Sequence, residues 1–331
     1  MNWVIWNVRG TNKWYKQKEL KNYLKSKHIQ LAGFVETRVK EPKAEKIMQH
    51  IAPGWKSYNS YLFAENGRVW VLWDEKNLEV SFIKAVAQYI HCHIKSRTDG
   101  MECALTVVYG FNTIEQRRSL WADVQTFAQA TSMPWIIGGD FNAILTVQDR
   151  LYGHPVTAYE IKGFAECVTN ATLTELPWRG DFYTWTNKQP ASDRIYSRID
   201  RFFGNDEWMW KWGHITTEYD LPNISDHSPM LLHIYQITWS PKLPFKFFNI
   251  WTEHADYVAT VNRGWTKWTQ GGRMKHVWQT LKLLKADFRK LNNEEFKCIN
   301  QKVAIHREEL RAVQNAMRTN TTDRLIQKER Y

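Results

Sequence analysis

The sequence predicts an α/β or α+β fold, in which helices cover sheets, over roughly the first 237 of its 331 residues. Short apolar runs rich in β-branched and aromatic residues alternate there with amphipathic segments of helical period. Many strands interspersed with a few helices favour layered sheets over a helix bundle. A length of 331 residues suits one large domain or two domains.

The individual elements follow from their apolar spacing. Strands are expected at residues 3–8, 31–35, 68–73, 80–84, 89–95, 101–109, 135–138, 182–186, 198–203 and 230–234. Helices are expected at residues 16–27, around 43–51, at 113–130 and at 159–169. The first helix, for example, places Leu20, Tyr23 and Leu24 on one face.

Residues from 238 onward follow a different pattern. Residues 239–247 are rich in proline and aromatic residues and predict a linker. Apolar residues at 4-3-4-3 spacing then predict an amphipathic helix, and a similar run after Asn292 and Asn293 predicts a second one. The stripe indicates a packing face and comprises Val277, Leu281, Leu284, Phe288 and Leu291, then Phe296, Ile299, Val303, Leu310, Val313 and Met317. We therefore expect a domain at residues 1–237 and a basic helical connector at 238–331.

The net charge of +11 is concentrated in the C-terminal third of the chain. From Thr238 onward, 18 Lys and Arg residues stand against 9 Asp and Glu residues, a net charge of +9. Such a segment suits a polyanionic partner or a neighbouring domain, and a solvated basic helical surface explains it equally well.

Composition argues against several classes of protein. No apolar run reaches the ~18 residues that span a bilayer, so no membrane partner is expected. Residues 1–6 lack the basic region and cleavage site of a signal peptide. The four cysteines are scattered without a CxxC pair, which argues against a zinc ribbon or disulfide framework and fits a reducing compartment.

The most informative segment is GGDFNA at residues 138–143, which follows an apolar run. Residues two apart at a strand end point to the same side, so Asp140 and Asn142 are expected to face one cleft. A carboxylate can accept a proton or bind a metal ion, and a carboxamide can donate a hydrogen bond to an anion. The alternative is a turn with an Asx cap, because Asp and Asn are common turn residues.

Several other predicted strands also end in a polar side chain. Each alone is explained by a surface or capping residue, but their number is hard to explain in that way. Open sheets bind ligands at strand ends, so these side chains are expected to converge on one cleft. They are Asn7, Glu36, Tyr109, Asp200, Asp226 and His227.

The motifs that carry these residues are WNVRG, VETRV, VYG, GDFNA, RIDR and SDHSP. Their order and spacing over residues 1–236 resemble the endonuclease/exonuclease/phosphatase superfamily, which includes DNase I-like nucleases and apurinic endonucleases. The sequence looks most like the endonuclease of plant LINE-type (non-LTR) retrotransposons, for which residues 182–187 and 198–201 are typical. The resemblance implies a four-layer α/β/β/α sandwich. Residues from 244 onward resemble the connector to a reverse transcriptase, of which the sequence shows no motif.

The resemblance implies phosphodiester hydrolysis with Mg²⁺, or alternatively Mn²⁺. Hard cations are held by carboxylates, water and substrate oxygens. Glu36 is the first choice of metal ligand, with Asp226 and Asn7 near it. The resemblance implies that Asp140 orients or deprotonates the attacking water and that Asn142 fixes Asp140 in place. His227 contacts the phosphate or acts as acid–base, and Asp200 holds the His227 ring. Tyr109 donates its hydroxyl to a phosphate oxygen. Whether Asp140 or His227 is the base stays open.

One position departs from the superfamily pattern. Many members carry an acid two residues after the first Asn, where this chain has Arg9. Arg9 cannot bind a metal ion but can contact a phosphate. We expect it to bind nucleic acid together with Arg38 and Asn112.

Three hypotheses for function result. The first is an Mg²⁺-dependent endonuclease that nicks one DNA strand and leaves a 3′-hydroxyl group, with RNA or a downstream reverse transcriptase as further partners. The second is a phosphatase or phosphodiesterase for a small or lipid ester, and the third is a catalytically silent nucleic-acid-binding remnant. The resemblance implies a nuclear location for the first, and a cytoplasmic one otherwise.

Two further clusters have simpler explanations. His91 and His93 fall on one strand face, but no other Cys or His lies at zinc spacing. Trp208, Trp210 and Trp212 are expected to pack a helix into the core rather than to stack on bases.

Overall fold

The computed structural model describes residues 1–190, 193–234, 249–265 and 273–291. The chain divides into two compact units, Met1–Gln236 and Ile237–Tyr331, and each is described by itself. The predicted linker at 239–247 and the second half of the apolar stripe, from Phe296 to Met317, lie outside the described residues.

The first unit contains a seven-stranded mixed sheet in the order β11-β15-β16-β1-β2-β4-β3. Strands β1 and β2 are parallel, and β16 runs antiparallel to β1. The strands are β1 (Asn2–Asn7), β2 (Ile29–Val35), β3 (Lys56–Asn59), β4 (Val69–Trp73), β11 (Trp178–Gly180), β15 (Thr217–Tyr219) and β16 (Met230–His233).

A six-stranded mixed sheet packs against the first, in the order β10-β14-β8-β7-β6-β5. Here β7 and β8 are parallel and β14 runs antiparallel to β8. The strands are β5 (Leu78–Val86), β6 (Tyr89–Ser96), β7 (Glu102–Tyr109), β8 (Trp135–Asp140), β10 (Thr174–Glu175) and β14 (Asp200–Gly204). A small third sheet pairs β12 (Trp185–Thr186), β13 (Tyr196–Ser197) and β9 (Arg150–Leu151).

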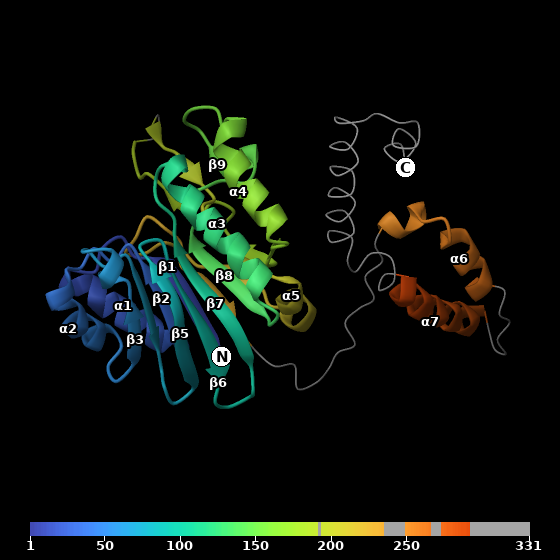
Figure 1. Cartoon of the computed structure of the whole chain (residues 1–331), viewed down its shortest axis with the longest axis horizontal. Coiled ribbons are helices and arrows are strands. Elements are labelled where there is room, and N and C mark those ends of the chain that lie inside the picture. The colour runs from blue at the N-terminus through green and yellow to red at the C-terminus, as the bar shows by residue number, and fades with distance from the viewer. Residues whose placement is uncertain (191–192, 235–248, 266–272, 292–331) are drawn as a thin grey trace, which may run out of the picture. The chain divides into compact units, whose positions relative to one another are not determined.

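Helices cover the outer faces of the two large sheets (Figure 1). Helices α1 (Trp14–Ser26) and α2 (Glu41–Ile51) pack on the first sheet, and α3 (Ile114–Ala130) and α4 (Ala158–Asn170) pack on the second. Strand alternation explains these layers. In β1, Trp3 and Ile5 point into the core between the sheets, whereas Val4 and Trp6 point toward α1 and α2. The four-layer sandwich predicted from the sequence is thus confirmed.

Local sequence sets the beginnings of two of these helices. The Thr113 hydroxyl accepts a hydrogen bond from the Gln116 backbone N–H, so α3 begins directly after it. Thr157 and Glu160 form a capping box at the start of α4. A short helix, α5 (Asp206–Trp212), follows β14 and begins at the Asn205 cap.

Two expected strands differ from the structure. Within 182–186 only Trp185–Thr186 is a strand, and the strand expected at 198–203 begins at Asp200. The Arg198 backbone N–H donates to the Asp149 carbonyl next to the β9–β13 pair, so Arg198 bonds toward the third sheet before the chain enters β14. Six strands of the described residues were not predicted, because each has at most four residues and is too short to show an apolar alternation: β3, β9, β10, β11, β13 and β15.

The prediction that all three tryptophans near residue 210 pack into the core was wrong for one of them. Trp208 is fully buried, but Trp210 is 77% exposed, because a short helix turns only one face inward.

The second unit contains α6 (Tyr257–Trp265) and α7 (Arg273–Leu291), preceded by a short 3-10 helix. The predicted stripe is buried at Leu284, Phe288 and Leu291, which pack around Trp251. Val277 and Leu281, at the start of the stripe, are exposed. Within the described residues, no helix is both long and apolar enough to cross a bilayer.

Candidate active site

The polar strand-end residues meet at one edge of the sandwich. Asn7 ends β1, Tyr109 ends β7, Asp140 ends β8, and Glu36 follows β2 directly. Because β1 and β2 are parallel, and so are β7 and β8, each pair of strands presents its last residues at one edge of its own sheet. Asp200 opens β14 directly opposite Asp140.

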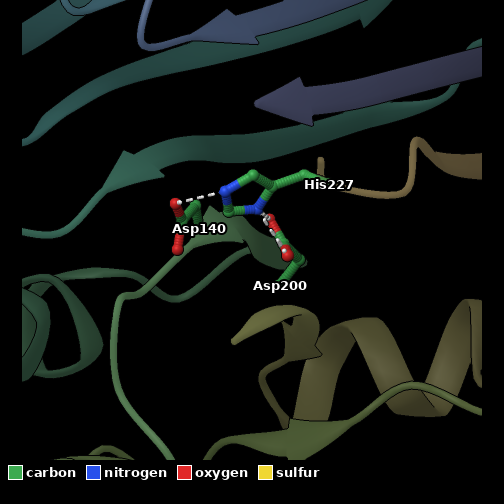
Figure 2. A group of neighbouring side chains, drawn as sticks. All are labelled: Asp140, Asp200 and His227. Carbon is green, nitrogen blue, oxygen red and sulfur yellow. Dashed lines mark hydrogen bonds and ion pairs between the residues drawn. The ribbon is translucent and has the colours of Figure 1, made fainter. Parts of the chain in front are cut away.

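The centre of the site is a buried group of Asp140, His227 and Asp200 (Figure 2). His227 Nδ1 lies 3.0 Å from Asp200 Oδ2, and its Nε2 lies 3.8 Å from Asp140 Oδ2. All three residues are at most 3% exposed. The Thr184 hydroxyl donates to Asp200 Oδ2 at 2.7 Å, which fixes the carboxylate that holds the imidazole.

Two carboxamides surround Asp140. Asn7 Nδ2 donates to Asp140 Oδ2 at 2.8 Å and to Glu36 Oε2 at 2.9 Å, so it joins the two sheets. The Asn142 backbone N–H donates to Asp140 Oδ1 at 2.9 Å, and its Nδ2 donates to the Gly110 carbonyl at 2.7 Å. The Asp140 carboxylate is therefore held in one orientation by groups from both sheets.

A glycine permits the close strand pairing beside Asp140. Gly139 has φ +146°, and a Cβ added there would lie 2.0 Å from the Val108 carbonyl oxygen. Because Gly139 has no side chain, β7 and β8 can approach closely at the point where these strands present Tyr109 and Asp140.

The protonation of this group follows from burial and from its charges. Burial raises the pKa of Asp140 to about 7, and the Asp200 carboxylate acts in the same direction. Burial alone would lower the pKa of His227, but the Asp200 and Asp140 carboxylates outweigh it and raise that pKa to about 9. His227 is thus an imidazolium at neutral pH, held between two carboxyl groups.

A cavity of about 340 Å³ opens above the buried group. Burial, followed by the Glu36 and Asp140 carboxylates, raises the pKa of Tyr109 in its wall, so this phenol stays a hydrogen-bond donor. The lining residues that the sequence predicted are Arg9, Glu36, Arg38, Tyr109, Asn112, Asp140, Asn142 and His227. The other predicted residues touch this set: Asn7 through Asp140, Asp200 through His227, and Asp226 through Arg9.

The rim of the cavity carries alternating charges. The Arg9 guanidinium pairs with Asp226, and its Nε lies 3.8 Å from Glu36 Oε1. Arg38 pairs with the same Glu36 oxygen. The Asp226 carboxylate also accepts a hydrogen bond from Trp185 Nε1 at 3.0 Å. Side-chain exposure is 41% for Arg9 but only 12% and 13% for the two carboxylates, so the acids are anchored and the bases reach outward.

Strained backbone is concentrated at this site. Arg9, Glu36, Arg38 and Asn142 have φ between 45° and 55°, the left-handed region that favours glycine. Such conformations persist only where the surrounding structure imposes them, and they cluster at ligand sites.

A second cavity of about 560 Å³ lies beside the first and shares Arg9 and Arg38 with it. Its wall is basic, with Lys13, Lys16 and Lys188. Lys16 Nζ donates to the carbonyls of Val8 and Arg9, so its charge is fixed close to the rim. The surface that continues from the buried group therefore favours an extended anion.

Sequence reasoning assigned no role to three residues that build the site. Thr184 holds Asp200, Trp185 binds Asp226, and the Ser225 hydroxyl donates to the Asn7 carbonyl at 2.7 Å. A signal was present, because residues 182–187 stood out as typical of the resembled branch. Their contacts are long-range, however, and spacing alone does not show them.

The residues fit a divalent cation in two ways. Ligand atoms of Asp140, Asp200 and His227 lie within 4.8 Å of one another, so this buried group could hold a metal ion. A hard cation such as Mg²⁺ prefers oxygen ligands and keeps several waters. The Glu36 and Asp226 carboxylates at the open cavity suit that preference better, because His227 is already hydrogen-bonded to Asp200.

Comparison with known proteins identifies the class. The family model of the endonuclease/exonuclease/phosphatase family matches residues 4–227, and the chain belongs to this family of hydrolytic nucleases and phosphatases, which generally depend on divalent metals. A comparison with curated proteins finds no match in sequence.

Solved structures share the fold of the first unit. One is the endonuclease domain of TRAS1, a telomere-specific non-LTR retrotransposon, with TM-score 0.55, 18% identity, and coverage of 71% of this chain and 99% of that one. Another is the AP endonuclease LMAP from Leishmania major, with TM-score 0.53, 14% identity, and coverage of 70% and 86%. A third is an endonuclease/exonuclease/phosphatase from Bacteroides vulgatus, with TM-score 0.52, 15% identity, and coverage of 70% and 97%.

Proposed function

We propose that the chain is a divalent-metal-dependent DNA endonuclease that nicks one strand and leaves a 3′-hydroxyl group. The observation that carries the proposal is the buried Asp140–His227–Asp200 group beneath a cavity lined by Glu36, with Asp226 in the wall of the adjoining cavity. The basic wall of the adjoining cavity favours a nucleic acid over a small ester, because it extends the positive surface beyond one phosphate.

The roles of the side chains follow from their protonation. Asp140, with a pKa near 7, accepts the proton of the attacking water at neutral pH. Charged His227 donates a hydrogen bond to a non-bridging phosphate oxygen and stabilises the negative charge that develops there. As water oxygen bonds to phosphorus, the bond from phosphorus to the 3′ oxygen breaks. That oxygen takes a proton from solvent water and leaves as the 3′-hydroxyl group, and Asp140 later returns the proton of the attacking water to solvent.

The other residues hold this arrangement. Asp200 and Thr184 keep the imidazole aimed at the cavity, and Asn7 and Asn142 orient Asp140. Tyr109 faces the cavity as a donor to a second phosphate oxygen. Glu36 and Asp226 would hold Mg²⁺ or Mn²⁺, which supplies neutralisation of the charge on the phosphate.

The test is nicking of supercoiled plasmid with Mg²⁺, with EDTA, and with the Asp140→Ala and His227→Ala variants. Matched controls are Asp123→Ala and His93→Ala, which remove the same residue types from ion pairs elsewhere on the second sheet and its helices. Open-circle product that requires Mg²⁺ and disappears only in the site variants supports the proposal. A folded, DNA-binding chain that never nicks would favour the silent remnant, and turnover of small phosphate esters alone would favour the phosphatase.

The resemblance to retrotransposon endonucleases also suggests further partners and a cellular location, and both are consistent with a DNA substrate. We propose a nuclear location and an association with RNA or a reverse transcriptase. A fluorescent fusion that is excluded from the nucleus would contradict the location.

A further inference from the structure

Arg9 lies where it neutralises two carboxylates at once. Its guanidinium pairs with Asp226 Oδ2 through Nη1, and its Nε faces Glu36 Oε1 at 3.8 Å. These are the carboxylates that the proposed function assigns to the divalent cation, and the inference rests on that assignment. Arg9 therefore faces one oxygen of each acid that would hold the metal ion.

Three of the four oxygens of the two carboxylates have close polar partners, and Asp226 Oδ1 has the Ser225 hydroxyl at 3.4 Å. Glu36 Oε2 accepts from Asn7 Nδ2 at 2.9 Å, and Glu36 Oε1 also pairs with Arg38. Asp226 Oδ2 accepts from Trp185 Nε1 at 3.0 Å as well as from Arg9. A cation that binds Glu36 through Oε1 or Asp226 through Oδ2 therefore competes with the Arg9 guanidinium for these oxygens.

Arg9 can leave without a change in the fold. Its backbone is fixed, because its N–H donates to Asn7 Oδ1 at 3.0 Å and its carbonyl accepts from Lys16 Nζ. Its side chain, by contrast, is 41% exposed and lines both cavities. A rotation of the side chain alone therefore takes the guanidinium from the acids into the path of an extended anion.

We propose that Arg9 is an internal counter-ion that exchanges with the divalent cation. In the metal-free protein it neutralises Glu36 and Asp226. When a divalent ion binds these acids, Arg9 is released and binds a phosphate of the nucleic acid, for which a guanidinium offers a two-pronged donor. Metal and nucleic acid then bind cooperatively, since each favours the released position of Arg9.

The first test measures Mn²⁺ binding to the metal-free chain by calorimetry or electron paramagnetic resonance, without DNA. Arg9→Gln should tighten the Mn²⁺ dissociation constant by about tenfold, because it removes both the competing cation and its repulsion of the metal. Arg9→Lys keeps the charge but loses the two-carboxylate contact, so its affinity should lie between the two. Arg179→Gln removes an equal charge from a surface pair with Glu218 and should leave the affinity unchanged.

Thermal unfolding shows whether these variants are folded and gives a second measure of their Mn²⁺ binding. The rise in melting temperature that Mn²⁺ produces should be larger for Arg9→Gln than for the original chain, since tighter binding gives more stabilisation. Equal or weaker Mn²⁺ binding by a folded Arg9→Gln variant would overturn the proposal.

The second test measures the exchange itself, as binding of a short DNA duplex in the Asp140→Asn background, which prevents cleavage. Adding Arg9→Gln should weaken duplex binding more with Mn²⁺ than without it, because only the released guanidinium reaches a phosphate. An equal loss under both conditions would contradict the exchange.

These outcomes separate the inference from the proposed function. Tighter Mn²⁺ binding by Arg9→Gln, with no nicking by any form, would support the counter-ion and reject the endonuclease. Mg²⁺-dependent nicking, with no change in Mn²⁺ affinity, would do the reverse.

Discussion

The buried Asp140–His227–Asp200 group and the rim of Arg9, Glu36, Arg38 and Asp226 are adjacent but built differently. The buried group is at most 3% exposed, comes from strand ends of both sheets, and is held by hydrogen bonds from Thr184 and from two asparagines. The rim is held by ion pairs between anchored acids and outward-reaching arginines. The first is fixed by the fold, whereas the second can exchange its partners.

One site thus combines preorganised catalytic groups with ion pairs that can exchange their partners. Proton transfer and transition-state stabilisation require preorganised groups, which the buried group provides. Exposed ion pairs contribute only ~0.2–1 kcal/mol each, so the rim can release them at low cost when a metal ion or phosphate arrives.

The largest effect should come from the buried group. His227→Ala should lower the rate of plasmid nicking by roughly 10³-fold, because the charged donor to the phosphate is lost. Single-turnover kinetics should show the loss in the rate constant and not in duplex affinity. A loss confined to affinity would place His227 among the binding residues and would remove the contrast with the rim.

The next effect concerns the charge that Asp200 maintains on His227. In the metal-free protein His227 should stay protonated up to a pH of about 9 and lose its proton only above it. Asp200→Asn removes a carboxylate that raises this pKa, so the titration should move to lower pH, and nicking should fall by roughly 10²-fold. NMR titration of the imidazole measures the first result. An unchanged titration would show that Asp200 does not support the charge.

A smaller effect is expected for the hydroxyl behind Asp200. Thr184→Val removes one of the two donors to the buried Asp200 Oδ2, the other being His227 Nδ1. It also removes the oxygen that accepts from the Ile199 and Asp200 backbone N–H groups. These losses should cost about 1–3 kcal/mol of unfolding free energy and slow nicking about tenfold. Chemical denaturation and nicking assays measure the two. Thr184→Ser, which keeps the hydroxyl, should restore both properties. A stable, fully active Thr184→Val variant would show that packing alone positions Asp200.

The smallest effect should come from the rim. Arg38→Ala should weaken duplex binding a few-fold and reduce the salt slope of binding by about one, as expected for a single phosphate contact. Binding isotherms at several salt concentrations measure it. A loss of nicking as large as that of His227→Ala would mean that the rim is as rigid as the buried group.

Much of the fold was predictable because its strands have strong local signals. The continuous apolar run at residues 3–6 predicts a strand buried on both faces, and in the structure one face packs on the second sheet and the other on helices. The short polar strand Lys56–Asn59 carries no such pattern, and its pairing with β4 depends on the rest of the sheet. The exposure of Trp210 likewise depends on tertiary packing.

The candidate site divides in the same way. Residues at strand ends, such as Asp140 and Asn7, could be predicted because parallel strands deliver them to one edge. Thr184 and Trp185 could not, since their contacts with Asp200 and Asp226 depend on tertiary pairing and no local pattern shows them. The ion pair of Arg9 with Asp226 joins residues 217 positions apart, which no local pattern shows.

The most direct test of the two-part site pairs plasmid nicking with Mn²⁺ binding in two variants. Asp140→Asn should abolish nicking but still bind Mn²⁺, because it alters only the buried group. Glu36→Gln should lose both, because it removes a carboxylate of the metal site. If Asp140→Asn lost Mn²⁺ binding while Glu36→Gln kept it, the metal would belong to the buried group and the division proposed for this site would be wrong.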